Sequence, residues 1–202
     1  IRIGIIKYIN SVPLAYGLER YGDIVLDSPQ RLAERFFNEE LDVAFIPSVE
    51  YLTHREHYHL IGGVSIASFG KTNSVFLVYQ GNLEEVRTVK LSAESLTSNF
   101  LVSEILSKRY GHEPVFVPAD DETVCDAEVV IGDEALRLAA EKEDTEHHLD
   151  LGQAWYELTG LPIVYAVCVT RVKELVPEFE EIFAEIKTWN AAQLAGILEE
   201  KG

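Results

Sequence analysis

The sequence predicts an α/β protein whose sheets are mixed but mostly parallel. Short β-branched runs alternate with helical segments along most of the 202 residues, and this order favours parallel strands joined by crossover helices. Hydrophobic residues make up 47% of the chain and charged residues 25%, which is typical of globular proteins and argues against long disordered tracts. A chain of this length can form one large domain or two smaller lobes.

The first quarter of the chain contains three units of a strand followed by a helix. Each strand is a short apolar run, and each helix follows a serine or proline that is typical of a helix start. Leu32, Phe36 and Phe37 are predicted to share one apolar face of the second helix. The strands are expected at 1–6, 24–26 and 43–46, and the helices at 12–20, from 28–29 onward, and from 47–48 to about 52.

The rest of the chain alternates in a similar way. Strands are expected at 60–68, 74–79, 86–91, 115–117, 128–131, 149–151 and 163–170. Helices are expected at 99–110, from 134 to about 141, at 152–159 and from 177 onward; Gly160 and Pro162 end the third of these. The last helix is amphipathic, with its apolar face formed by Phe179, Ile182, Phe183, Ile186, Leu194, Ile197 and Leu198. If there are two lobes, strands cross between them near 70–78 and 160–168.

Net charge excludes two classes of partner. The chain has 17 Lys and Arg against 34 Asp and Glu, a formal net charge of −17, which argues against nucleic acid or an anionic membrane surface as partner. No apolar run reaches the roughly 18–20 residues of a membrane span, and no segment resembles a signal peptide. Cys125 and Cys168 lack a metal-type spacing and predict a reducing, cytoplasmic location.

Four predicted strands run directly into small or polar residues at a helix start. The unpaired N–H groups of a helix N-terminus can hold a carboxylate or phosphate without Lys or Arg. In open α/β sheets such turns gather at the carboxyl ends of the strands, where ligands bind. The alternative is that Ser48, Ser98 and Asp133 only cap their helices. The four turns are Asn10-Ser11, Pro47-Ser48, Ser95 to Ser98, and Gly132-Asp133.

Conventional catalytic and metal-binding groups are scarce at these turns. Their only carboxylate is Asp133, so the predicted site is suited to binding and orienting an anion and not to supplying a strong base. Residues 54–59 include three histidines, but spacing fixes no Cys or acidic partner for zinc. We interpret this run as a solvated helix end, and we predict no metal and no cofactor.

Eight motifs together resemble the chorismate dehydratase family of the futalosine route to menaquinone. They occur in order from residue 8 to about 166, and the final Asp-Leu-Gly, Trp and Thr-Gly-Leu-Pro block is the most specific. The motifs are Tyr8–Leu14, Leu41–Leu52, Ile66–Gly70, Ser74–Val75, Ser95–Ser98, Ile131–Leu136, Asp150–Trp155 and Thr159–Pro162.

The resemblance implies the two-lobed fold of type 2 periplasmic-binding proteins, with a ligand cleft between the lobes. We expect residues 1–72 and 166–202 in the first lobe and residues 73–165 in the second. The implied reaction removes water from chorismate to give 3-[(1-carboxyvinyl)oxy]benzoate. The oligomeric state is not predicted.

The resemblance also assigns roles to residues. Asn10 and Ser74 occupy the positions of the family's key catalytic residues, and one family mechanism lets the substrate's own enolpyruvyl carboxylate remove the ring proton. We expect Thr97 and Ser98 to bind one substrate carboxylate. The other substrate-binding residues are expected to be Ser11, Ser48, Gly132 and Asp133.

Three other functions remain as alternatives. A non-catalytic solute-binding protein for a small carboxylate would share the fold. The related 1,4-dihydroxy-6-naphthoate synthase has a different first turn, and the Tyr-x-Asn motif at Tyr8 and Asn10 favours the dehydratase. A small-molecule sensor domain is the weakest alternative, because no DNA-binding or signalling module is evident.

Overall fold

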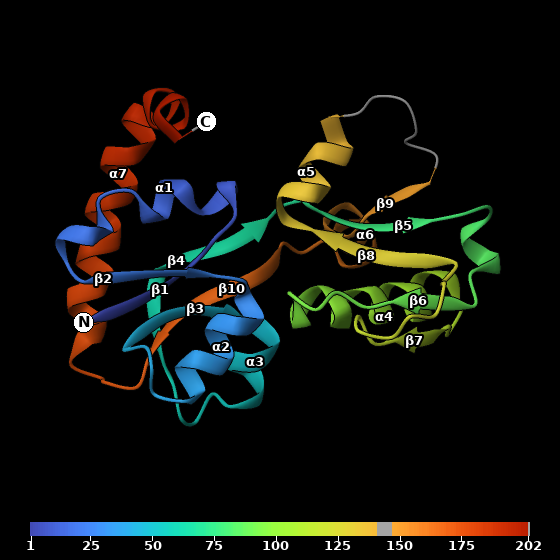
Figure 1. Ribbon diagram of the computed structural model, residues 1–202, viewed down its shortest axis with the longest axis horizontal. Coiled ribbons are helices and arrows are strands. Elements are labelled where there is room, and N and C mark those ends of the chain that lie inside the picture. The colour runs from blue at the N-terminus through green and yellow to red at the C-terminus, as the bar shows by residue number, and fades with distance from the viewer. Residues whose placement is uncertain (141–146, 202) are drawn as a thin grey trace. The chain divides into compact units, whose positions relative to one another are not determined.

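The computed structural model describes residues 1–140 and 147–201, and it divides into two compact units (Figure 1). Unit 1 comprises Ile1–Ile66 and Ala166–Gly202, and unit 2 comprises Ala67–Tyr165. Each unit is built on a five-stranded sheet of its own within the described residues. The chain passes from one unit to the other within two strands, β4 (His59–Ser68) and β10 (Ile163–Thr170).

The sheet of unit 1 is mixed, with parallel strands on one side. β1 pairs in parallel with both β2 and β3, whereas β10 pairs antiparallel with β3. The alternating strand-and-helix order of the first quarter of the chain predicted the parallel pairs. The strand order is β2 (Asp23–Asp27), β1 (Arg2–Ile6), β3 (Val43–Pro47), β10 and β4.

Helices cover both faces of this sheet. A Cβ on Gly4 of β1 would lie 2.9 Å from Leu32 of α2 and 3.3 Å from Ala44 of β3, so these residues face α2. The next residue of β3, Phe45, points to the opposite face and meets Phe183 of α7 at 5.6 Å between ring centroids. The helical elements of unit 1 are η1 (Ile9–Ser11), α1 (Val12–Ala15), η2 (Leu18–Arg20), α2 (Pro29–Phe37), α3 (Ser48–Thr53) and α7 (Leu175–Lys201).

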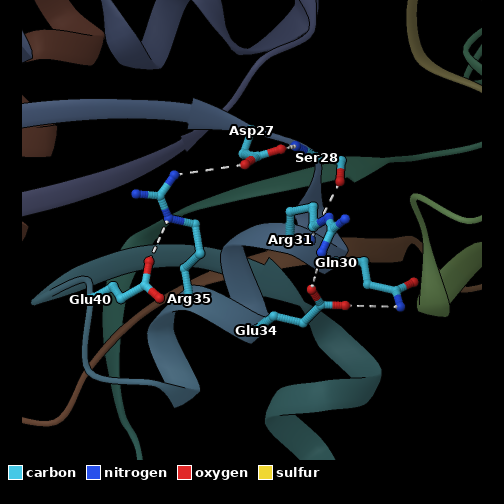
Figure 2. A network of polar contacts seen from close by, with 7 residues as sticks. All are labelled: Asp27, Ser28, Gln30, Arg31, Glu34, Arg35 and Glu40. Atoms are coloured by element: carbon cyan, nitrogen blue, oxygen red, sulfur yellow. Dashed lines mark hydrogen bonds and ion pairs between the residues drawn. The ribbon is translucent and has the colours of Figure 1, made fainter.

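Polar contacts occur at both ends of α2 (Figure 2). Ser28 is the N-cap, and its hydroxyl accepts a hydrogen bond from Arg31 N. Arg35 contacts Asp27 at 3.8 Å and Glu40 at 3.1 Å, and these exposed pairs contribute little each. The prediction that Phe37 shares a face with Leu32 and Phe36 is wrong, since those two are buried and Phe37 is 64% exposed. At about 100° per residue it lies well away from the face of Leu32 and Phe36.

The predicted helix at 12–20 is also wrong in detail. The structure has two short helical elements there, α1 and η2, because Tyr16 is extended and Gly17 has a left-handed φ of 91°. A residue in the left-handed region ends a helix, and glycine adopts it without steric cost.

Unit 2 contains the second mixed sheet. β6 pairs in parallel with β7 and β8, whereas β5 pairs antiparallel with β8 and β9. The strand order is β7 (Val115–Val117), β6 (Thr88–Lys90), β8 (Ala127–Ile131), β5 (Val75–Tyr79) and β9 (His148–Asp150). The helical elements are η3 (Leu83–Glu85), α4 (Leu96–Tyr110), α5 (Gly132–Ala140) and α6 (Leu151–Thr159).

Alternate residues of β5 and β8 build two cores in unit 2. Phe76 and Val130 pack on Ala135 of α5. Their neighbours Leu77 and Val129 point to the opposite face, on which α4 and α6 pack. The expected helix end at Glu141 lies outside the described residues.

The apolar face predicted for the last helix is buried in unit 1. Phe179, Ile182, Phe183, Ile186 and Ile197 are all buried in α7. The side chains of the other two predicted members, Leu194 and Leu198, lie outside the described part of the structure.

Asn190 attaches α1 to α7. It is fully buried, and its Nδ2 donates to the carbonyl oxygens of Pro13 at 2.7 Å and Tyr16 at 2.9 Å.

Asn190→Ala leaves both carbonyls unpaired, so we expect the free energy of unfolding in urea to fall by about 1–3 kcal/mol. The control is Thr188→Ala on the exposed face of the same helix, expected to change it by less than about 0.5 kcal/mol. Equal losses in the two variants would contradict the assigned role.

Candidate functional site

Ser74 and the Gly132-Asp133 turn lie side by side at one edge of the unit 2 sheet. β5 begins at Val75, opposite Ile131, the last residue of β8. The amide of Gly132 donates to the carbonyl oxygen of Ser74 at 2.9 Å. Antiparallel pairing of β5 with β8 therefore brings together two predicted site segments that are far apart in the sequence (Figure 1).

The start of α4 belongs to the same edge. β6 and β8 are parallel, so their carboxyl ends lie at one edge of the sheet, and α4 follows β6 after a short loop. Thr97 and Ser98 are in the first turn of α4 and are 3% and 1% exposed. Parallel strands thus place the Thr97-Ser98 and Gly132-Asp133 turns at one edge, as in open α/β sheets that bind ligands there.

The expectation that Ser98 could be a helix N-cap is wrong. α4 begins three residues earlier than predicted, and Ser95 is its N-cap. The Ser95 hydroxyl accepts a hydrogen bond from Ser98 N at 3.2 Å, and the two hydroxyls lie 2.8 Å apart. Ser98 therefore contributes to the structure of the helix start through Ser95. Asp133 is the second residue of α5, inside the helix, and is exposed.

Sequence reasoning did not select three residues that the structure places near Ser74, namely Thr72, Asp150 and Tyr165. The hydroxyls of Thr72 and Ser74 lie 3.1 Å apart. Asp150, the N-cap of α6, accepts hydrogen bonds from the amides of Thr72 and Asn73. The third residue is Tyr165 on β10. A signal for Asp150 was available, because an aspartate between a strand and a helix is typical of an N-cap with spare acceptor capacity.

Tyr165 carries a buried hydroxyl beside this group. A Cβ placed on Gly152 would lie 2.9 Å from that hydroxyl and 2.7 Å from Ser68 Oγ, and no described group meets the Tyr165 hydroxyl in hydrogen-bond geometry. Burial raises the pKa of Tyr165 to about 12. The nearby polar side chains of Ser68 and Thr72 act to lower this pKa, and the negative charge of Asp150 acts to raise it further. The phenol is therefore neutral at physiological pH and can serve as a hydrogen-bond donor.

In unit 1 the other three predicted residues follow two adjacent parallel strands. Asn10 and Ser11 lie in η1 after β1, and Ser48 is the first residue of α3 after β3. Asn10 is exposed, whereas Ser11 is 2% exposed and donates to Asn10 Oδ1 at 3.3 Å. Ser48 is not an N-cap, because Pro47 holds that position. The Ser48 hydroxyl is buried, and no described group pairs with it.

No metal centre forms within the described residues. No group of three or more His, Cys, Asp and Glu side chains there is arranged to hold an ion. Of the histidine run, His54 follows the last turn of α3 and pairs with Glu50 at 3.0 Å, while His57 is exposed. None of the helices in the described ranges has both the length and the apolar character needed to cross a bilayer.

Solved structures define the class of protein. AF1704 from Archaeoglobus fulgidus aligns with 99% of this chain and 80% of its own, at a TM-score of 0.71 and 19% identity. The periplasmic aliphatic sulphonate binding protein SsuA from Escherichia coli aligns over 98% of this chain and 76% of its own chain, with a TM-score of 0.61 and 14% sequence identity. A third similar structure, from Candida albicans, is described as having the generic periplasmic binding protein fold, at a TM-score of 0.63 and 13% identity. The chain is an α/β protein with this fold, as predicted.

Sequence comparison then gives the family. A family model described as menaquinone biosynthesis matches residues 1–201, and the chain belongs to that family. Chorismate dehydratase from Thermus thermophilus is 29% identical over 87% of this chain, which spans 72% of that enzyme. The chorismate dehydratase of Campylobacter jejuni is 28% identical over 81% of this chain, and the match spans 64% of that enzyme's length. The resemblance found in the motifs is confirmed.

The raised pKa of Tyr165 predicts a loss of stability in alkali. Between pH 10 and 12 the unfolded chain releases the Tyr165 proton while the folded chain keeps it, so the free energy of unfolding falls as the pH rises. In urea titrations across this interval, we expect the parent to lose up to about 3 kcal/mol more than Tyr165→Phe. Identical slopes in the two proteins would show that Tyr165 titrates normally.

Proposed function

We propose that this protein is a chorismate dehydratase, a carbon–oxygen lyase that converts chorismate to 3-[(1-carboxyvinyl)oxy]benzoate. The observation that carries the proposal is the match of the family model to residues 1–201, together with chorismate dehydratases as relatives over most of the chain. We place the reaction in the cytoplasm. The two free cysteines, with Cys168 fully buried, support this location.

The chemistry suits a site of neutral donors and helix starts. Chorismate loses a ring proton and the ring hydroxyl, and the two leave as water. The ring becomes aromatic, which drives the elimination, so a powerful base is not required. Holding the enolpyruvyl carboxylate against the ring proton allows the substrate to act as its own base, and such placement can be worth several kcal/mol.

Each predicted residue has a proposed task in this reaction. Asn10, whose side chain is exposed after β1, orients the enolpyruvyl carboxylate or hydrogen-bonds the departing hydroxyl. Ser74 assists one of these tasks through its hydroxyl. The start of α4, with Thr97 and Ser98, binds one carboxylate through the positive end of the helix.

The remaining substrate-binding residues line the other sides of chorismate. Ser48 is suited to this role because its hydroxyl has no partner among the described residues. Ser11 supports Asn10 through their hydrogen bond. The Gly132-Asp133 turn adjoins Ser74, since the Gly132 amide is bonded to the Ser74 carbonyl.

Incubation with chorismate tests the proposal directly. We expect chorismate to be consumed and an aromatic product to appear, separated by chromatography and identified by mass and ultraviolet spectrum. Tight binding without product would instead indicate a non-catalytic binding protein with this fold. If chorismate is neither bound nor converted, the proposal fails.

Asn10→Ala tests the proposed catalytic role within that assay. The side chain is exposed, so we expect the variant to stay folded while kcat falls at least about 100-fold, as when an orienting donor is removed from other sites. The control is Asn38→Ala, an exposed asparagine at the end of α2, whose kcat should match the parent. A fully active Asn10→Ala enzyme would remove Asn10 from the mechanism.

A further inference from the structure

The Asp150 carboxylate is a buried acceptor for three backbone amides. It is 7% exposed, and its oxygens accept from Thr72 N at 3.0 and 3.2 Å, from Asn73 N at 2.8 Å and from Gln153 N at 2.9 Å. Within residues 1–140 and 147–201, no lysine or arginine forms an ion pair with it. The amides and the N-terminus of α6 therefore stabilise the negative charge.

Asp150 is itself firmly placed. It is the last residue of β9, where it pairs with Phe76 of β5, and it is the N-cap of α6. A carboxylate attached both to the sheet and to a helix start has little freedom to move. The amides bound to it take their position from the sheet.

Two of those amides, Thr72 N and Asn73 N, belong to the turn that leads into Ser74, whereas the third, Gln153 N, is in α6. Gly70 has a φ of 82° and Asn73 a φ of 57°, so the turn contains two residues in the left-handed region. A non-glycine residue there is strained and persists only where its surroundings hold it. The Asp150 carboxylate bonds the Asn73 amide, and the next residue along the chain is Ser74.

Close packing joins the start of α6 to the same turn. A Cβ on Gly152 would lie 2.6 Å from the Gly70 carbonyl oxygen and 2.7 Å from Ser68 Oγ, so only glycine fits. The Asp-Leu-Gly motif at 150–152 therefore has a physical explanation. Asp150 supplies the carboxylate that accepts from the turn amides, and Gly152 lets the start of α6 come close enough to the turn for those hydrogen bonds to form.

We infer that Asp150 is a positioning residue for Ser74: its carboxylate fixes the 70–74 turn and so sets the direction of the Ser74 hydroxyl. The effect passes through Thr72, whose amide binds Asp150 and whose hydroxyl lies 3.1 Å from that of Ser74. The consequence for catalysis rests on the proposed function, in which Ser74 acts on chorismate. The positioning itself does not depend on that function.

Asp150→Asn is the variant that tests this inference. Asparagine keeps the size of the side chain and can still cap α6, but it replaces one acceptor oxygen with an NH2 group, so at least one of the bonded amides loses its partner. We expect kcat for chorismate to fall at least about 10-fold, as for a small displacement of a reacting group, with KM changed much less.

Asp126→Asn is a matched control in the same unit. Asp126 likewise accepts from two consecutive amides, those of Arg87 and Thr88, and from the Thr88 hydroxyl, each at 2.9 Å. It precedes β8 and so lies at the opposite end of that strand from Gly132. We expect this variant to lose stability while keeping the parent kcat. Equal losses of kcat in the two variants would overturn the inference.

A double-variant cycle separates positioning from general support. If Asp150 acts through Ser74, then Asp150→Asn should cost little further kcat in a Ser74→Ala background. Losses that multiply as independent effects would show that Asp150 works by another route, and the inference would fail.

Amide hydrogen exchange measured by NMR tests the positioning without chorismate. In Asp150→Asn we expect Thr72 and Asn73 to lose protection and the Ser74 resonances to shift, while Asp126→Asn leaves all three unchanged. Unshifted Ser74 resonances in Asp150→Asn would overturn the inference, whatever the enzyme does. If Ser74 shifts but the parent converts no chorismate, the proposed function fails and the positioning by Asp150 stands.

Discussion

Parallel pairing of adjacent strands is the constraint on which the candidate site depends. β1 lies parallel to β3 in unit 1, and β6 lies parallel to β8 in unit 2. In each pair the carboxyl ends share one edge of the sheet, and a helix or a helical turn begins just beyond that edge. Polar residues separated by tens of positions in the sequence therefore become neighbours within their unit, and several backbone amides gather at each edge.

These edges bear on how an acidic protein would hold the anionic substrate that the proposed function requires. The chain has a net charge of −17, so long-range electrostatics oppose an approaching dicarboxylate. Helix starts and hydroxyl groups act only over short distances, and they can outweigh the wider field at the point of contact. The same physics operates inside unit 2, where the buried Asp150 carboxylate is held by backbone amides.

The elements were predictable where the local pattern had a single interpretation. The β-branched runs at β1, β3 and β10 appear as expected, and Ser28 caps α2 as predicted. Predictions failed at the ends of elements, where several neighbouring residues are each able to start or end a helix. Ser95 and not Ser98 caps α4, and the left-handed Gly17 divides the first predicted helix. Propensities alone do not rank such competitors, because the hydrogen bonds that decide between them are formed only after folding.

The sequence by itself determined the fold class, the family and the segments that contain the candidate residues, because these follow from hydrophobic periodicity and from motifs contiguous in the chain. Only the tertiary structure decided that Asp150 binds the turn before Ser74, and that the Gly132 amide meets the Ser74 carbonyl. Both contacts join residues more than fifty positions apart. They arise from the strand order of the unit 2 sheet, which no local pattern encodes.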